Sequence, residues 1–388
     1  MIYFLILFFL FILFYLYDVL HITKGVRFFW FFSFALLVLV AGLRFKVGGD
    51  TFSYLNNYEY FPTFFEFASF DFENARYDFF WYVFCAICKL FSTSYFFMQF
   101  MHAFLINIAF FYFIKKYIKY KFLGVFLYFI FGFLYFNTEI MRESLAVAVF
   151  LFSLDAFYNK KWIRYFLFVT VAVLFHSSAL ILAICPFLYK IKLNKFFWVS
   201  IILIVFVSNV LWTIFNDYIA YFSHFLTIGD KVDSYLGNEM YESNINGVIR
   251  SLFTYFLIPF IFSVFAFYKT QKSFKEIPFL WFYIVLGVFT IFHQVLFSRL
   301  QNYLFFPFIA FVANLCYETS KDRQHKPIRL KNLRLVMLFI LLFFGRYYLF
   351  FKLDVYEDSF IYERYFPYYS IISEETSPAR ASLEFYGD

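Results

Sequence analysis

Charged residues are scarce in this sequence of 388 residues: they make up 15% of the chain, whereas hydrophobic residues make up 63%. A soluble protein of this composition would expose far too much apolar surface, so the soluble globular class is excluded. Glycine (12) and proline (8) are also few, which argues against paired broken helices of the kind found in transporters. No period of about 20–50 residues recurs, which excludes solenoids and propellers.

Cysteine (4) is rare as well, and its spacing does not form a metal site. Cys85 and Cys88 make a CxxC pair inside an apolar run, but no second pair or nearby histidine completes a zinc-binding set. We therefore expect buried thiols, with no metal and no cofactor. The net charge of +7 comes from short basic connectors, none of which resembles an arm that binds nucleic acid.

Long apolar runs are what the chain has in abundance, each of about 17–25 residues, the length that spans a bilayer. They fall at about 2–20, 27–43, 94–114, 121–136, 139–158, 162–184, 196–215, 248–268, 278–297, 301–317 and 332–350. A shorter run at 79–90 is one more candidate. We expect an all-α polytopic membrane protein with about 11–13 transmembrane helices.

The chain divides by polarity into a helical part and a tail. Residues 1–350 are expected to form a single transmembrane helical domain, and residues 351–388 a polar tail. Two polar segments inside the helical part, 44–78 and 216–247, are predicted to be extracytoplasmic loops. The first apolar run lacks a basic region before it and a small-residue cleavage site after it, so it is expected to be a retained helix.

The orientation of these loops leaves a conflict. The strongly basic connectors can all face the cytoplasm, as the positive-inside rule favours, if the helix that begins at about residue 162 is broken near His176. That arrangement would place 44–78 inside unless the region 79–114 also departs from a simple hairpin. The acidity of 44–78 favours the outside, although acidic residues contribute little to orientation.

Polar groups at the end of the second apolar run are the main functional signal. Arg44, Gly48, Gly49, Asp50 and Tyr54 lie together at a membrane boundary, where polar groups are costly. Arg44 offers planar paired donors that suit a phosphate, and the two glycines let the backbone approach a ligand closely. Asp50 is a candidate general base or a partner for an arginine. A helix stopped by glycine, with a solvated carboxylate, is the simpler alternative.

Further polar positions interrupt the later apolar runs. Arg142 has either a functional role or a local ion pair with Glu139. His176 lies inside an apolar run, where an ionisable residue by default faces the bundle interior; a neutral, hydrogen-bonded core histidine is the alternative. Arg299 and Tyr303 share a short polar turn, and anchoring at the membrane surface would also explain this arginine.

Separated arginines, a carboxylate and a histidine together fit a lipid-linked diphosphate substrate. Arginines stabilise the charge that builds on a diphosphate leaving group as the glycosidic bond breaks. Asp50 or His176 can take the proton of an acceptor hydroxyl. Because paired carboxylates of the DxD kind are absent, the reaction is expected to be metal-independent.

At these residues the sequence resembles the EpsG family, membrane proteins of the Wzy polymerase type that assemble bacterial exopolysaccharide and O-antigen chains. The matching pieces are Arg44-x3-Gly48-x-Asp50-x3-Tyr54, Met141-Arg142-x2-Leu145-Ala146, Phe175-His176-x-Ser178-Ala179, Arg299 and Phe366-Pro-Tyr-Tyr-Ser-Ile-Ile372. Thr51 stands where the family usually has an aromatic residue, and Glu143 where it usually has glutamine.

The resemblance implies a GT-C-like helical bundle in the bacterial plasma (inner) membrane. It implies transfer of a growing glycan from undecaprenyl diphosphate to a hydroxyl of another lipid-linked repeat unit, on the outer face. We assign catalytic roles to Asp50, His176 and Arg142. Substrate binding is assigned to Arg44, Gly48, Gly49, Tyr54, Arg299 and Tyr303. The expected partners are the lipid-linked oligosaccharide, membrane lipid and, as an open candidate, a chain-length regulator.

Three other functions remain as alternatives. An O-antigen ligase differs only in its acceptor, and would be expected to carry a larger outer loop than 216–247. A transporter or flippase for the same lipid-linked sugar should show internal repeats or interrupted helices. An acyltransferase that uses His176 would require a nearby carboxylate in an HxxxxD pattern, and the residues that follow His176 supply none.

Overall fold

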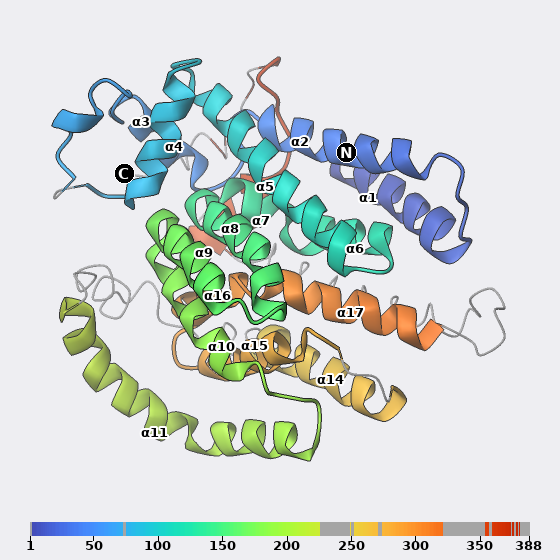
Figure 1. Ribbon diagram of the computed structural model, residues 1–388. Helices are drawn as coiled ribbons and strands as arrows, with labels where there is room; N and C mark the ends of the chain where they lie inside the picture. Colours follow the sequence, from blue (N-terminus) through green and yellow to red (C-terminus); the bar gives the residue numbers. More distant parts are fainter. Residues whose placement is uncertain are drawn as a thin grey trace. The chain divides into compact units, whose positions relative to one another are not determined.

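The computed structural model describes most of the chain: residues 2–72, 75–225, 249, 252–270, 274–320, 354–356, 359–373, 375, 378 and 380. Contacts divide the chain into two compact units, unit 1 (residues 1–180 and 322–388) and unit 2 (residues 181–321). The described residues are nearly all helical (Figure 1), which confirms the all-α polytopic class. The single domain expected over residues 1–350 stays a prediction.

Nine helices of unit 1 come from the first half of the chain. They are α1 (Ile2–Leu13), α2 (Val26–Gly42), α3 (Thr51–Tyr58), α4 (Phe79–Lys89), α5 (Tyr95–Tyr117), α6 (Lys121–Tyr128), α7 (Leu134–Thr138), α8 (Met141–Tyr158) and α9 (Trp162–Phe175). Helix α1 continues as π-helix to Val19, and a π-helical stretch joins α6 to α7, so each pair forms one apolar span. Ser94 begins α5 because its hydroxyl accepts a hydrogen bond from the Phe96 N–H.

The core of unit 1 lies around α5, which packs against α2 on one side and α8 on the other. Its buried polar groups bond to one another: the side-chain amide of Asn107 donates to Asn137 Oδ1 at 3.0 Å, and the Tyr128 hydroxyl donates to Asn107 Oδ1 at 3.0 Å. The Asn137 amide donates to the Tyr128 oxygen at 2.9 Å, which completes the network. These bonds tie α5 to α6 and α7, because no water competes for them in an apolar interior.

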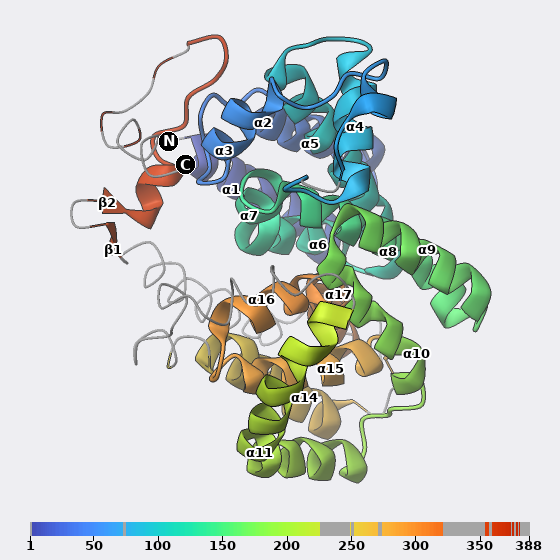
Figure 2. The ribbon, with the colours of Figure 1, turned by 90° about the vertical axis from the view of Figure 1, so that its left-hand side faces the viewer.

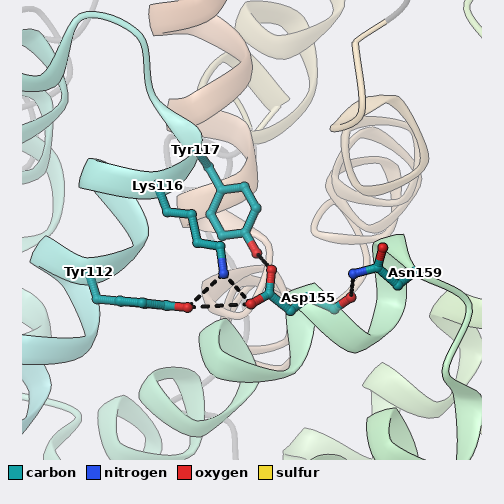
Figure 3. Close-up of polar contacts among 5 residues, drawn as sticks. All are labelled: Tyr112, Lys116, Tyr117, Asp155 and Asn159. Atoms are coloured by element: carbon teal, nitrogen blue, oxygen red, sulfur yellow. Dashed lines mark hydrogen bonds and ion pairs between the residues drawn. The ribbon is translucent and has the colours of Figure 1, made fainter.

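A second polar cluster joins α5 and α8 near their C-terminal ends (Figure 3). Lys116 forms an ion pair with Asp155, and the hydroxyls of Tyr112 and Tyr117 donate to the same carboxylate at 3.4 and 2.8 Å. Helix α9 then returns along α8 as a close hairpin. Both contacts fix the direction of α8, whose first turn carries Arg142.

The tail of the chain contributes to unit 1 as well. Strands β1 (Asp354–Tyr356) and β2 (Ser359–Phe360) form a small antiparallel ribbon, followed by a 3₁₀ turn, Ile361–Arg364. Residues 361–373, which we name the tail strap, then run beside the start of the chain (Figure 2). The ring of Tyr3 on α1 contacts Phe366 and Tyr368, with centroids 5.0 and 5.8 Å apart.

Unit 2 is a helical cluster around one buried helix, α15. Its helices are α10 (Cys185–Leu188), α11 (Lys195–Phe225), α14 (Ile258–Lys269), α15 (Ile277–Phe289), α16 (Gln294–Asn302) and α17 (Phe305–Ser320). Gly287 of α15 lies so close to Tyr255 that a Cβ would sit 2.1 Å from its carbonyl oxygen. Only glycine allows this approach.

Five helical segments of the described residues are long and apolar enough to cross a membrane, or six if α16 and α17 count as one bent span. The predicted run 332–350 lies outside the described residues, so the expected number of spans stays a prediction. The predicted break near His176 is confirmed, because α9 ends at Phe175 and 3₁₀ helix follows.

One feature of the helices was not foreseen and one expectation about them is wrong. Helices α16 and α17 meet at a bend of 64°, so that together they can form one bent span. Residues 216–225, expected to begin a polar loop, continue α11 to Phe225. Helix hydrogen bonds propagate at one per residue, so polarity alone did not end this helix. The rest of the predicted loop, 226–247, lies outside the described residues.

Gln99 offers a test of how the end of α2 is held. Its buried side-chain amide donates to the carbonyls of Gly42 and Arg44 at 2.8 and 2.9 Å. Gln99→Leu should lower the free energy of unfolding by about 2–3 kcal/mol, because it leaves buried carbonyls without donors. Thermal unfolding of the purified protein in detergent measures this loss. The control Thr213→Val, at an exposed position of α11, should cost less than about 0.5 kcal/mol; equal melting temperatures for both variants would contradict the prediction.

Candidate functional site

Arg44 follows α2 and is almost fully enclosed, at 1% exposure. Its Nε donates to the Val47 carbonyl at 3.1 Å, its Nη1 donates to the Ala41 carbonyl at 2.6 Å, and its Nη2 lies 3.6 Å from the sulfur of Met141. The guanidinium therefore closes the loop after α2 and connects it to the start of α8. The substrate-binding role assigned to Arg44 from the sequence stays a prediction.

The tail strap pairs with the same loop through its backbone. Three backbone hydrogen bonds of 2.9 Å join the two segments: Phe45 N–H to Tyr369 O, Ile371 N–H to Leu43 O, and Gly48 N–H to Arg364 O. The loop thus gains partners from residues that the sequence analysis had treated as a separate polar tail. The aromatic and apolar residues 365–372 were the available signal, because a free tail rarely carries such a run.

Each glycine of the pair has its own geometric reason. Gly48 adopts φ +108°, and a Cβ there would lie 2.5 Å from the Cβ of Thr138. At Gly49 a Cβ would lie 2.7 Å from Nη1 of Arg364 and 2.8 Å from Oε2 of Glu139. The Gly49 N–H also donates to Glu139 Oε1 at 2.7 Å. The close approach that glycine permits is therefore made to neighbouring protein groups.

Arg142, in the first turn of α8, is held from two other elements. Its Nε donates to the Tyr54 hydroxyl at 3.2 Å, its Nη1 lies 3.5 Å from Asp78 Oδ2, and its guanidinium lies 4.6 Å from the ring centroid of Tyr77. The side chain keeps 21% exposure. Its carboxylate partner is Asp78, whereas Glu139, the partner considered from the sequence, forms an ion pair with Arg364 at 3.7 Å.

Asp50 and Tyr54 lie one helical turn apart at the start of α3. Asp50 is exposed, and its carbonyl accepts the Tyr54 N–H at 3.1 Å. Burial raises the pKa of Tyr54 to about 12, so its phenol stays protonated at neutral pH. The structure thus brings Asp50, Tyr54 and Arg142 into one neighbourhood, with the acid open to solvent and the arginine half-buried.

His176 lies at the break after α9, with an extended backbone (φ −158°, ψ 119°). Its Nδ1 is 2.6 Å from the Ser178 hydroxyl, and the side chain is half-buried. Because α8 and α9 form a hairpin, the end of α9 lies beside the start of α8. The ring of Phe175 also contacts Phe80 of α4, with centroids 5.4 Å apart. His176 therefore belongs to the same end of unit 1 as Arg142 and Asp78.

Arg299 and Tyr303 belong to unit 2. Arg299 is half-buried in the last turn of α16, and Tyr303 is fully buried directly after it. Between them, Gln301 donates to the Tyr283 carbonyl at 2.7 Å and so secures the bend before α17. Their convergence with the residues of unit 1 stays a prediction.

The sequence analysis missed three polar residues of unit 1: Asp78, Arg364 and His102. Asp78 stands directly before an apolar run, where a helix begins, and Arg364 meets Glu139 from a distant part of the chain. His102 is fully buried on α5, and its Nε2 lies 2.9 Å from both Met141 O and Ser144 Oγ. The argument applied to His176, a histidine inside an apolar run, would have found His102 too.

Gly48 offers a test of the loop geometry. Gly48→Ala should lower the free energy of unfolding by about 1–3 kcal/mol, because alanine must adopt a positive φ and its methyl must displace Thr138. Gly25→Ala is the matched control: it shares a positive φ of 82°, but its Cβ would come no nearer than 3.1 Å to the Tyr17 hydroxyl and 3.5 Å to the Phe29 ring. Thermal unfolding in detergent compares the two. Equal losses would refute the close contact with Thr138.

Comparison with known proteins bears on this arrangement. No curated protein and no solved structure is significantly similar to the chain. The sequence profile of the EpsG family matches residues 27–370. This range includes the loop after α2, the starts of α3 and α8, the break at His176 and most of the tail strap, and it covers most of the 388 residues. The chain belongs to the EpsG family.

Proposed function

We propose that the protein is a membrane polysaccharide polymerase of the bacterial plasma (inner) membrane. It transfers a glycan from undecaprenyl diphosphate to a hydroxyl of another lipid-linked repeat unit, without a metal ion. Membership of the EpsG family supports the coarser part of this proposal, a membrane protein of the exopolysaccharide or O-antigen polymerase type. The substrate, the acceptor and the roles of single residues are our inference.

One observation carries the proposal: Arg142 is a half-buried cation that residues of other elements hold in a fixed position. Tyr54 and Asp78 hold its guanidinium, and 21% of the side chain remains exposed. The partial positive charge at the N-terminus of α8 adds to its field. A cation held in this way stabilises charge that develops on a leaving diphosphate, because little reorganisation is needed during the reaction.

Two groups are candidates for the general base. Asp50 is exposed and lies one turn from Tyr54, which contacts Arg142. His176 is half-buried, and Ser178 fixes the orientation of its ring through Nδ1. Either group can accept the proton of an acceptor hydroxyl as the new glycosidic bond forms. Both remain open, and the proposed partners are the lipid-linked oligosaccharide, membrane lipid and a chain-length regulator.

The structure changes the case for the transporter as an alternative function. The bend between α16 and α17 removes the argument that interrupted helices are absent, so this feature no longer counts against a transporter. Family membership favours the polymerase instead. An O-antigen ligase would use the same cation and base with another acceptor, so an assay that offers both a lipid-linked repeat unit and lipid A core as acceptors separates the two.

The proposal predicts that single-unit lipid-linked glycan persists while long chains disappear in two variants. Arg142→Ala and Arg299→Ala should each lower the rate of polymerisation by about 10²–10³-fold, because each removes a cation from the leaving group. The measurement is the length distribution of glycan made from purified lipid-linked repeat unit in proteoliposomes.

Arg164→Ala is the matched control, because this exposed arginine of α9 lies at the opposite end of the α8–α9 hairpin. It should polymerise as the wild type does. Normal chain lengths in Arg142→Ala and Arg299→Ala would remove both residues from the mechanism. A wild-type protein that attaches glycan only to lipid A core, and not to a second repeat unit, would replace the polymerase with a ligase.

A further inference from the structure

Arg364 ends the 3₁₀ turn at the start of the tail strap and lies directly over the glycine pair. Its carbonyl accepts the Gly48 N–H at 2.9 Å. Its guanidinium lies over Gly49, where a Cβ would sit 2.7 Å from Nη1 and 3.1 Å from Cζ. The position of this arginine therefore explains why residue 49 has no side chain.

The guanidinium of Arg364 is less fully bonded than that of Arg44. Its Nη1 lies 3.7 Å from Glu139 Oε2, beyond hydrogen-bond distance, and 26% of the side chain is exposed. Its Nε is buried and has no hydrogen-bond partner. Arg44, in contrast, donates to two backbone carbonyls and is 1% exposed. Arg364 thus keeps donors that a ligand can use.

Glu139 compensates the charge of Arg364 only in part, because the carboxylate has other donors. The Gly49 N–H donates to Oε1 at 2.7 Å, and the Tyr365 hydroxyl also hydrogen-bonds to this carboxylate. A carboxylate that already accepts two hydrogen bonds gains less energy from a further contact at 3.7 Å. The ion pair with Arg364 is therefore one that an anion can replace.

Arg364 and Arg142 also contact residues that lie close to one another in the sequence. Glu139, the contact of Arg364, lies three residues before Arg142. Gly49, which lies under Arg364, precedes Asp50, and the turn from Asp50 leads to Tyr54, the contact of Arg142. Two partly exposed guanidinium groups thus contact neighbouring residues of the same two segments, and a pair of arginines suits the two phosphates of a diphosphate.

We propose that Arg364, from the tail strap, binds one phosphate of the carrier diphosphate while Arg142 binds the other. Glu139 holds the Arg364 guanidinium in place until the diphosphate enters, and then remains bonded to Gly49 and Tyr365. This inference rests on the proposed function, because it names a second substrate-binding cation in the same site.

The test measures binding of undecaprenyl diphosphate and undecaprenyl monophosphate to the purified full-length protein in lipid nanodiscs. Arg364→Gln should weaken binding of the diphosphate by about 10–100-fold, the range expected for a lost charge-assisted bond. Binding of the monophosphate, which Arg142 alone can hold, should change much less. Arg364→Lys should restore part of the loss, because it keeps the charge without the paired donors.

Glu139→Gln separates ligand binding from a structural ion pair. Its amide oxygen still accepts the Gly49 N–H, but it no longer neutralises Arg364. Binding of the diphosphate should therefore be as tight as in the wild type, or tighter. If the pair only anchored the tail strap, Glu139→Gln and Arg364→Gln would lose affinity alike, and that result would overturn the inference even where Arg364→Gln folds poorly.

Arg164→Gln, which removes a cation from the other end of unit 1, should bind the diphosphate as the wild type does. Wild-type affinity in Arg364→Gln would refute the role of Arg364 and leave the polymerase intact. A wild-type protein that binds the diphosphate but forms no polymer would refute the proposed function instead, while the affinities of the variants would still decide the role of Arg364.

Discussion

The burial of one guanidinium, that of Arg44, determines how the rest of the candidate site is built. An arginine enclosed in an apolar interior is tolerated only when its donors are satisfied, and here two backbone carbonyls and the sulfur of Met141 surround it. These contacts fix the direction of the chain after α2. The glycine pair, the start of α3 and the first turn of α8 take their positions from that direction. Arg44 therefore supports the loop after α2, whereas its contact with substrate stays a prediction.

Much of the architecture followed from the apolar runs, because a bilayer requires long helices with internally satisfied backbones. The boundaries of α2, α5 and α8 lie within a few residues of the predicted runs. The break at His176 was predicted from charge distribution rather than from local propensity. Helix α11 was predicted to end too early, because polar residues can continue a helix when nothing blocks its hydrogen bonds.

The site was only partly predictable, for a physical reason. Arg142, Asp50 and Tyr54 could be chosen because charge and hydroxyl groups stand out near a membrane boundary. Two contacts could not be predicted, since Asp78 reaches Arg142, and Arg364 reaches Glu139, only through tertiary folding. Glu139 was named from the sequence, but as a partner of Arg142. The roles of Gly49 and Arg364 depend on each other, because the Arg364 guanidinium lies where a methyl group at position 49 would be.

The pairing of the tail strap with the loop after α2 has a consequence for biosynthesis. The loop hydrogen-bonds with Arg364, Tyr369 and Ile371, which are synthesised long after the loop itself. The helices of the first half can insert into the membrane early, but the loop between α2 and α3 then lacks three of its backbone partners. The loop takes the conformation described here only after residues 364–371 have been synthesised.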